Sequence, residues 1–147
     1  MSPRYALYLA PPADSPWGEF GAQWLGRCAI RGRGGPARTT AAAIAGLDEA
    51  LRAQLVAQPA RYGFHATLKA PFRLRSDAVA GALIAQLDQF CSEQSGFPLP
   101  RLQPARLGNF IALVPGAADP RVDALATACV TRFPRNFVGS KSMRKNS

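Results

Sequence analysis

The sequence is poor in the residues that build metal and disulfide sites. His65 is the only histidine, and the absence of a carboxylate or thiolate cluster beside it argues against a bound transition metal. The three cysteines, Cys28, Cys91 and Cys129, are odd in number, far apart and without CxxC spacing, so neither a disulfide framework nor a zinc site is expected. Cys91 and Cys129 fall within apolar helical patterns, where we expect small buried residues. No cofactor is implied.

Long apolar runs and a signal-peptide layout are also missing. No run approaches the roughly 20 apolar residues that span a bilayer. The amino terminus, Met1 to Tyr5, leads straight into a strand-like segment without a charged region followed by an apolar region and a cleavage site. We therefore expect a cytoplasmic protein that does not enter a membrane.

Acidic residues are few, with 9 against 18 basic residues and a formal net charge of +9. Five of the basic residues lie after residue 131, where no acid occurs, and without them the formal charge is +4. That excess suits a small phosphate-bearing ligand as well as a polynucleotide, so weak RNA binding is one expectation. The basic, glycine-rich run from Arg31 to Pro36 lacks the Gly-Lys-Ser/Thr ending of a nucleotide-binding P-loop.

What remains is a mixture of short strands and helices. Apolar and aromatic runs predict strands at 5–10, 61–69 with an extended continuation to 74, 99–106 and 110–114. Helical spacing predicts helices at 17–25, 39–56, 76–90 and 119–129, the second with Ile44, Leu47, Leu51 and Leu55 on its apolar face. Without regular βαβ alternation, the fold class is α+β, a mainly antiparallel sheet with helices packed on it. We expect residues 1–137 to form one lobe and 138–147 to be a disordered basic tail.

The segment from Ala60 to Phe72 carries the chemistry. In a strand, alternate side chains share a face, so His65, Thr67 and Lys69 are predicted to project together from an open face. That trio fits a phosphate, since a hydroxyl donates a hydrogen bond, an ammonium stabilises negative charge and an imidazole moves a proton. A histidine that serves only packing is the other interpretation of this spacing.

The run Tyr62-Gly-Phe-His-Ala-Thr-Leu-Lys-Ala-Pro-Phe72 resembles the first His-x-Thr signature of the 2H phosphoesterase superfamily. More narrowly, it is similar to a branch described as phosphonate-metabolism proteins, a domain family of unknown function. The opening run from Arg4 to Pro11 resembles that branch's first strand, and Trp24 to Arg27 its following helix. The likeness extends over about residues 4 to 133.

The resemblance implies a two-lobed fold in which each lobe supplies one His-x-Thr/Ser motif. One histidine then acts as general base and the other as general acid on a phosphodiester, and no metal is required. Carried over residue by residue, it makes His65 and Thr67 catalytic and places Lys69 and Tyr62 in contact with the substrate. The second motif is absent, and the composition after Phe133 indicates a truncated or out-of-frame ending, leaving one lobe and part of another.

We therefore expect a phosphonate-metabolism protein resembling a metal-independent 2H cyclic phosphodiesterase, acting on a small phosphate ester or cyclic phosphate and impaired in this chain. One alternative is an RNA-end-processing 2′,3′-cyclic phosphodiesterase or 2′–5′ ligase-like protein. The other is a non-catalytic module that binds phosphate or RNA. A lobe built to pack against a second lobe leaves an apolar face uncovered, which predicts self-association as a homodimer.

Overall fold

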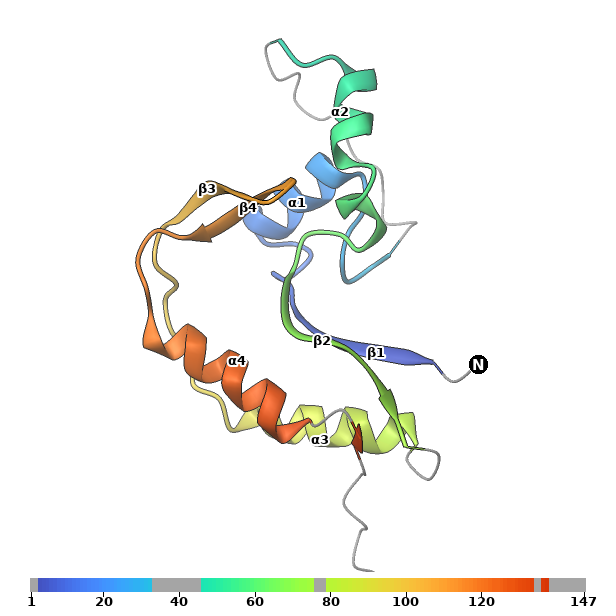
Figure 1. The fold of residues 1–147 in the computed structure, drawn as a ribbon, viewed down its shortest axis with the longest axis vertical. Coiled ribbons are helices and arrows are strands. Elements are labelled where there is room, and N and C mark those ends of the chain that lie inside the picture. Colours follow the sequence, from blue (N-terminus) through green and yellow to red (C-terminus); the bar gives the residue numbers. More distant parts are fainter. Residues whose placement is uncertain (1–2, 33–45, 76–78, 134–135, 138–147) are drawn as a thin grey trace, which may run out of the picture. The chain divides into compact units, whose positions relative to one another are not determined.

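A computed structural model describes residues 3–32, 46–75, 79–133 and 136–137 of the chain (Figure 1). The elements, in order, are β1 (Arg4–Leu9), α1 (Pro16–Leu25), α2 (Glu49–Val56), a 3-10 turn (Pro59–Arg61), β2 (Ala66–Leu74), α3 (Ala80–Ser92), β3 (Leu102–Leu107), β4 (Phe110–Pro115), α4 (Pro120–Arg132) and β5 (Asn136–Phe137). The α+β class predicted from the sequence is confirmed. The chain divides into two compact units, the first formed by Met1–Leu7 with Leu68–Ser147 and the second by Tyr8–Thr67.

The strands form a three-stranded and a two-stranded sheet. The three-stranded sheet has the order β1-β2-β5, and β5 runs parallel to β2 with Arg73 opposite Asn136. The two-stranded sheet is the antiparallel hairpin β3–β4, in which Leu107 pairs with Phe110 across Gly108 and Asn109. The hairpin was predicted at this turn. The short β5 was not, because two residues are too few to show a periodic pattern.

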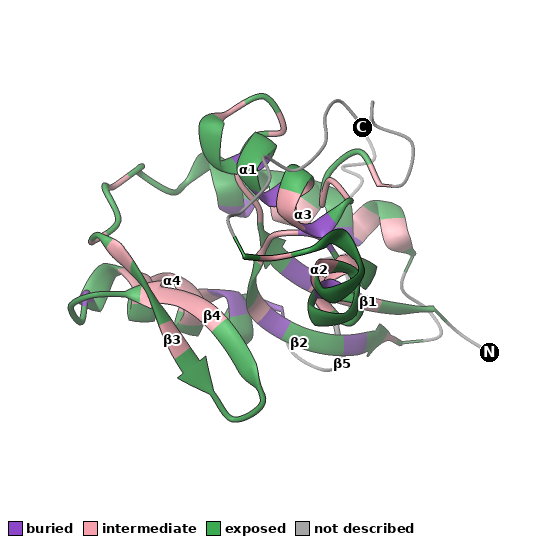
Figure 2. Ribbon diagram, turned by 90° about the horizontal axis from the view of Figure 1, so that it is seen from above, coloured by how far each residue is buried: buried purple, intermediate pink, exposed green. Residues whose placement is uncertain are grey.

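The core of the first unit lies between β1 and β2 on one side and α3 and α4 on the other. Its buried side chains come from all four elements and from the residue after α4: Leu7, Phe72, Leu83, Phe90, Cys129 and Phe133. The rings of Phe90 and Phe133 meet edge to face at 5.6 Å, and Phe133 is completely inaccessible to solvent. Within β2, Lys69 and Phe72 are the buried positions, and Figure 2 shows buried stretches of this strand in purple.

Helix α4 begins where the sequence predicts. Asp119 is its N-cap and accepts a hydrogen bond from the backbone N–H of Arg121 at 2.9 Å, and Pro120 occupies the first helical position. The Arg121 guanidinium also donates to the Asp119 carboxylate, and this hydrogen bonding holds the pKa of that carboxyl below its ordinary value. The cap and the ion pair together fix the start of the helix.

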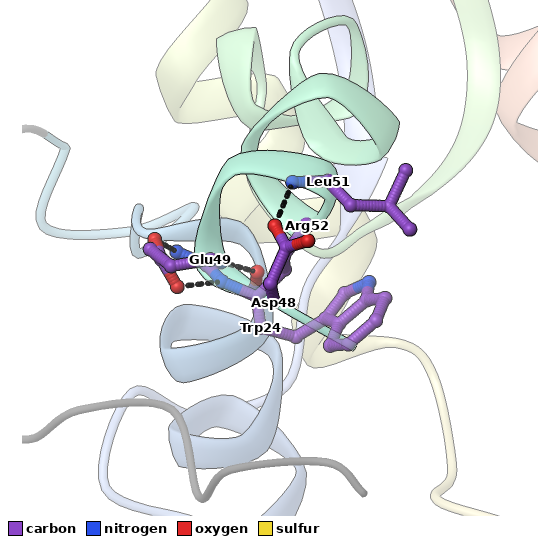
Figure 3. Close-up of polar contacts among 5 residues, drawn as sticks. All are labelled: Trp24, Asp48, Glu49, Leu51 and Arg52. Atoms are coloured by element: carbon purple, nitrogen blue, oxygen red, sulfur yellow. Dashed lines mark hydrogen bonds and ion pairs between the residues drawn. The ribbon is translucent and has the colours of Figure 1, made fainter. Parts of the chain in front are cut away.

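In the second unit, one arginine ties α2 to the end of α1. Arg52 forms an ion pair with two hydrogen bonds to Glu49 one turn earlier, and it donates a third hydrogen bond to the backbone carbonyl of Trp24 (Figure 3). That carbonyl is in the last turn of α1, where carbonyl groups lack partners within the helix. Asp48 caps α2 by accepting from the Leu51 N–H at 2.7 Å. The carboxyl-terminal end of α1 is therefore held in place from outside the helix.

Helix boundaries differ from the prediction at two places. The helix expected over 39–56 begins only after Asp48, and its predicted apolar face is wrong because Leu51 and Leu55 are exposed, Leu55 to 60%. Asp48 forms the N-cap here, and residues 39–45 lie outside the described residues. The helix expected from Ser76 is α3, whose N-cap is Val79, and 76–78 are likewise outside the described part.

The strand expected over 61–69 is displaced toward the carboxyl terminus. A 3-10 turn covers Pro59–Arg61, and β2 starts only at Ala66. Gly63 explains the delay, because its φ of 81° lies in the left-handed region and is incompatible with a strand. His65 therefore precedes the strand in which it was predicted.

The expected disordered tail, 138–147, also lies outside the described residues. Within the part of the chain that the structure covers, no helix is both long and apolar enough to cross a bilayer.

The two helical cysteines differ in exposure. Cys129 is buried, as predicted, whereas Cys91 is exposed, contrary to the prediction. Burial raises the pKa of the Cys129 thiol, the nearby Cys91 thiol adds to that shift, and Lys69 opposes it.

Because the thiolate is the reactive species, we predict that iodoacetamide at neutral pH modifies Cys91 before Cys129 reacts measurably. Peptide mapping checks the order of labelling, with unfolded protein as the control in which all three cysteines react. Equal rates for Cys91 and Cys129 in the folded protein would contradict this assignment.

The tip of the hairpin exposes large apolar side chains. Leu107, Phe110 and Ile111 are all exposed, Ile111 to 76%. Because exposed apolar groups in one patch favour association, self-association through a homodimer contact stays a prediction. We expect Ile111→Lys to lower the apparent mass in sedimentation at high concentration. Val79→Lys is the matched control, since Val79 is similarly exposed at the start of α3. A wild-type chain that stays monomeric at high concentration would contradict the expectation.

Candidate functional site

His65 is held by the backbone two residues before it. Its Nδ1 lies 2.8 Å from the carbonyl oxygen of Gly63. A carbonyl oxygen can only accept, so the hydrogen bond requires Nδ1 to carry the proton. In the neutral imidazole, Nε2 is then the nitrogen with a free lone pair. The contact thus determines both the orientation of the ring and which nitrogen can accept a proton.

Thr67 meets that second nitrogen. Its Oγ1 lies 3.3 Å from His65 Nε2, and its side chain is exposed. The hydroxyl donates to Nε2 when the imidazole is neutral and accepts from Nε2–H when it is protonated. The two side chains therefore meet on one side of the chain, as the His-x-Thr spacing predicts. They present a hydroxyl and an imidazole nitrogen at the same place.

Two tyrosine rings flank the imidazole. The ring of Tyr8, in β1, packs on His65 with centroids 3.9 Å apart and planes inclined by 34°. Tyr62 approaches from the edge at 6.2 Å and is 55% exposed. Tyr8 was missed in the sequence analysis, since it lies 57 positions from His65 and only strand pairing brings the two together. The signal in the sequence that could have pointed to Tyr8 as a neighbour of His65 is its aromatic side chain.

Close packing against α1 positions the residue before His65. Phe64 lies against Gly21, where a Cβ on the glycine would come within 2.3 Å of the Phe64 Cβ. The Trp17 ring stacks on Phe64 at 6.3 Å, and Phe20 meets it edge-on at 6.5 Å. Only a residue without a side chain at position 21 allows this approach. Phe64 therefore anchors the segment that leads into His65.

Gly63 is constrained in the same way. A Cβ at this position would lie 2.7 Å from the backbone of Ala29, and the φ of 81° disfavours any residue with a side chain. Two close contacts, at Gly21 and at Gly63, thus fix the path of the chain on either side of Phe64. The carbonyl that orients His65 belongs to one of these constrained residues.

Lys69 has different surroundings from those predicted. Its side chain is only 6% exposed, so the expectation that it projects from an open face is wrong. Its ammonium lies 5.1 Å from the centroid of the Phe72 ring, within the range of a cation–π contact. Among the described residues the ammonium has no hydrogen bond or ion pair with a carboxylate. The alternation argument failed because burial along β2 does not follow a period of two.

The described part of the chain holds no group of three or more histidine, cysteine or acidic side chains placed to share a metal ion. A depression of about 550 Å³ lies between the 94–97 loop and α4 in the first unit, but its lining is mostly apolar. Its single charged residue, Arg121, is already engaged by Asp119 and by the Phe97 ring at 5.0 Å. The depression therefore offers no group for acid–base chemistry.

Comparisons with known proteins point to two long relatives and one family. A family described as "Protein of unknown function (DUF1045)" matches residues 67–138, about half of the chain. A protein of Janthinobacterium sp. (strain Marseille) named ribose 1,5-bisphosphate phosphokinase PhnN is 38% identical over 130 residues, which are 88% of this chain and 28% of that protein. A protein of the same name from Laribacter hongkongensis (strain HLHK9) is 41% identical over 127 residues, 86% of this chain and 29% of its own length.

The chain thus spans less than a third of the length of the curated relatives that it matches. No solved structure matches it.

We predict that Gly63→Ala both destabilises the protein and displaces His65. A side chain at this φ costs about 1–3 kcal/mol, and the clash with Ala29 adds to that cost. Gly108→Ala is the matched control, because its φ of 61° is also left-handed but nothing lies within 4 Å of the added Cβ. Thermal unfolding measures the difference, and ¹⁵N NMR of the imidazole reports whether Nδ1 keeps its proton. Equal destabilisation by the two variants and an unchanged imidazole spectrum would refute the role given to Gly63.

Proposed function

We propose that His65 and Thr67 form half of a metal-independent phosphodiesterase site that acts on a cyclic phosphate of a ribosyl compound in phosphonate metabolism. The observation that carries the proposal is the chain of contacts from the Gly63 carbonyl through the imidazole to the Thr67 hydroxyl. These contacts place His65 Nε2, which can accept a proton, beside the Thr67 hydroxyl, which can donate a hydrogen bond. The Thr67 side chain is exposed to solvent. The resemblance of this segment to the first 2H signature supports the same roles.

The chemistry follows from those two groups. Water attacks phosphorus, the proton of the water passes to His65 Nε2, and one ester P–O bond of the cyclic phosphate breaks. The departing ribose oxygen takes a proton from solvent water, because the sequence holds no second imidazole, and the product is an acyclic phosphate monoester. Thr67 donates its hydroxyl hydrogen to a phosphoryl oxygen, which stabilises the charge that develops during the attack. We assign contact with the sugar of the ester to Tyr62, whose exposed ring lies 6.2 Å from the imidazole.

The second proton transfer is where this chain is deficient. One imidazole acts at a given moment as base or as acid, and the sequence holds no other histidine. Each positioned proton transfer contributes about 10²–10⁴-fold to the rate. Lys69, the remaining cation of the predicted trio, is buried over the Phe72 ring and does not replace the missing imidazole. We infer that the chain binds phosphate esters weakly and turns over cyclic phosphodiesters very slowly or not at all.

The names of the relatives support a ribosyl phosphate as the substrate class. Both are named for a kinase of ribose 1,5-bisphosphate, and hydrolysis of a cyclic phosphate on a ribose phosphate yields a compound of that class. The kinase activity itself is not proposed for this chain. The chain matches less than a third of each relative, and its glycine-rich run from Arg31 to Pro36 lacks the lysine and hydroxyl of a P-loop.

The proposal predicts how two substitutions act on ligand binding and turnover. We expect His65→Ala and Thr67→Val each to weaken binding of a ribosyl cyclic phosphate, and His65→Ala to abolish any residual hydrolysis. The measurements are calorimetric titration and product assay with a chelator present, since no metal is invoked. Thr127→Val is the control, because Thr127 is an exposed threonine on α4. The variants are compared only after thermal unfolding shows that each is folded.

The ligand used in the assay separates the alternative functions. Preference for a nucleoside 2′,3′-cyclic phosphate over a small ribosyl cyclic phosphate favours RNA-end processing. Binding of either ligand with no turnover, unaffected by His65→Ala, favours a module that only binds phosphate. Fast, His65-dependent turnover by a proven monomer would overturn the conclusion that one imidazole is insufficient.

A further inference from the structure

We propose that Tyr8 is a positioning residue of the His65 site, its ring lying on one face of the imidazole and holding Nε2 in the direction of the Thr67 hydroxyl. The inference deepens the proposed function and rests on it for the role of the histidine as a base. Sequence reasoning gave Tyr8 no role beyond its place in the first strand.

The contact between Tyr8 and His65 is the closest aromatic pair in the described residues. The two centroids are 3.9 Å apart, whereas the other ring pairs are 5.6 to 6.5 Å apart. Aromatic pairs usually have centroids about 4.5–7 Å apart, either offset or edge to face. At 3.9 Å, with planes inclined by 34°, the phenol ring covers much of one face of the imidazole.

The hydrogen bond to Gly63 leaves one movement of the imidazole open. It holds Nδ1 at 2.8 Å from the carbonyl oxygen, but a single hydrogen bond tolerates a range of angles. The ring can therefore swing about that oxygen and carry Nε2, on its far side, away from Thr67 Oγ1. A second ring packed on the face of the imidazole fills the space on one side of it. The hydrogen bond thus selects the tautomer, and Tyr8 restricts the direction in which Nε2 points.

The helix that holds the residue before His65 also holds the chain after Tyr8. Four residues after Tyr8, the Pro12 carbonyl lies against α1, where a Cβ on Gly18 would come within 2.0 Å of its oxygen. The same helix packs on Phe64 through the close glycine contact one turn further along. Both rings of the pair are therefore tied to α1, within one compact unit.

The stacked ring leaves the reacting nitrogen accessible. Nε2 accepts a proton in the plane of the imidazole, whereas Tyr8 lies on its face. The contact at 3.3 Å with Thr67 Oγ1 shows that the edge of the ring is open to a neighbouring group. Tyr8 is 41% exposed, so its ring is not part of an apolar core. Positioning by Tyr8 requires the aromatic ring and not the phenol hydroxyl.

The test is proton NMR of the imidazole in the full chain and its variants. His65 is the only histidine, so its two carbon-bound ring protons are identified without ambiguity. Protons above the face of an aromatic ring resonate upfield, and we expect Tyr8→Leu to move both resonances downfield, toward their positions in the unfolded chain. Tyr8→Phe keeps the ring and should leave them near their wild-type positions. Tyr5→Leu is the matched control, because Tyr5 is also in β1 but its ring contacts Phe72, at 6.4 Å.

Ligand binding measures what the positioning contributes to the site. In calorimetric titration of inorganic phosphate and of ribose 5-phosphate, we expect Tyr8→Leu to weaken binding by about 2- to 10-fold, the range that corresponds to one stacked aromatic pair. Tyr8→Phe should bind both ligands as the wild-type chain does. Thermal unfolding of each variant shows that it is folded before the comparison is made.

Unchanged imidazole resonances in a folded Tyr8→Leu variant overturn the inference, as do resonances that move equally far in Tyr8→Phe or Tyr5→Leu. Wild-type resonances at their unfolded positions overturn it without any variant. Weaker binding by His65→Ala with full affinity in Tyr8→Leu also overturns it, because the imidazole then serves the ligand without Tyr8. Failure of the proposed function gives a different result. The resonances then respond to Tyr8→Leu as expected, while His65→Ala leaves the binding of both ligands unchanged.

Discussion

The hydrogen bond from His65 Nδ1 to the Gly63 carbonyl is the interaction on which the candidate site depends. It selects the tautomer that leaves Nε2 free, and it turns that nitrogen toward the Thr67 hydroxyl. Without it the imidazole rotates about two side-chain bonds and either nitrogen can carry the proton. One backbone carbonyl thus converts a histidine and a threonine two residues apart into a defined donor and acceptor pair.

That carbonyl is fixed because the chain around it is closely packed on both sides. Gly63 lies against Ala29, and Phe64 is enclosed by Gly21 and the aromatic rings of α1. The same packing sets the position of the turn after α1, and the Trp24 carbonyl near the end of that helix accepts a hydrogen bond from Arg52 (Figure 3). The end of α1, the turn at Cys28 and the approach to His65 therefore share one set of contacts.

The first unit is stabilised by apolar packing, in contrast to the hydrogen bonds that orient His65. Its core is a continuous apolar cluster from β1, β2, α3 and α4, closed by Phe133. Among the described residues, Lys69 is the one buried cation beside this cluster, over the ring of Phe72, and the Cys129 thiol nearby has a raised pKa mainly because it is buried. Packing rather than polar contact orders this part of the chain. The β3–β4 hairpin is an exception, since the apolar residues at its tip face solvent.

The sequence by itself determined the class of the fold and the contact between His65 and Thr67 in the candidate site. Local signals sufficed for α1 and α4, where a capping side chain precedes a proline, and for the hairpin at Gly108. The His-x-Thr spacing was enough to predict that the two side chains meet. It was not enough to predict the surroundings of Lys69, because burial along β2 depends on what packs against each face.

Only the tertiary structure brought Tyr8 onto the His65 ring and Phe64 against Gly21. Those relations join residues far apart in the chain, and no local preference encodes them. The physical reason is that strand pairing and close packing at glycines act between segments, whereas caps and turns act within one.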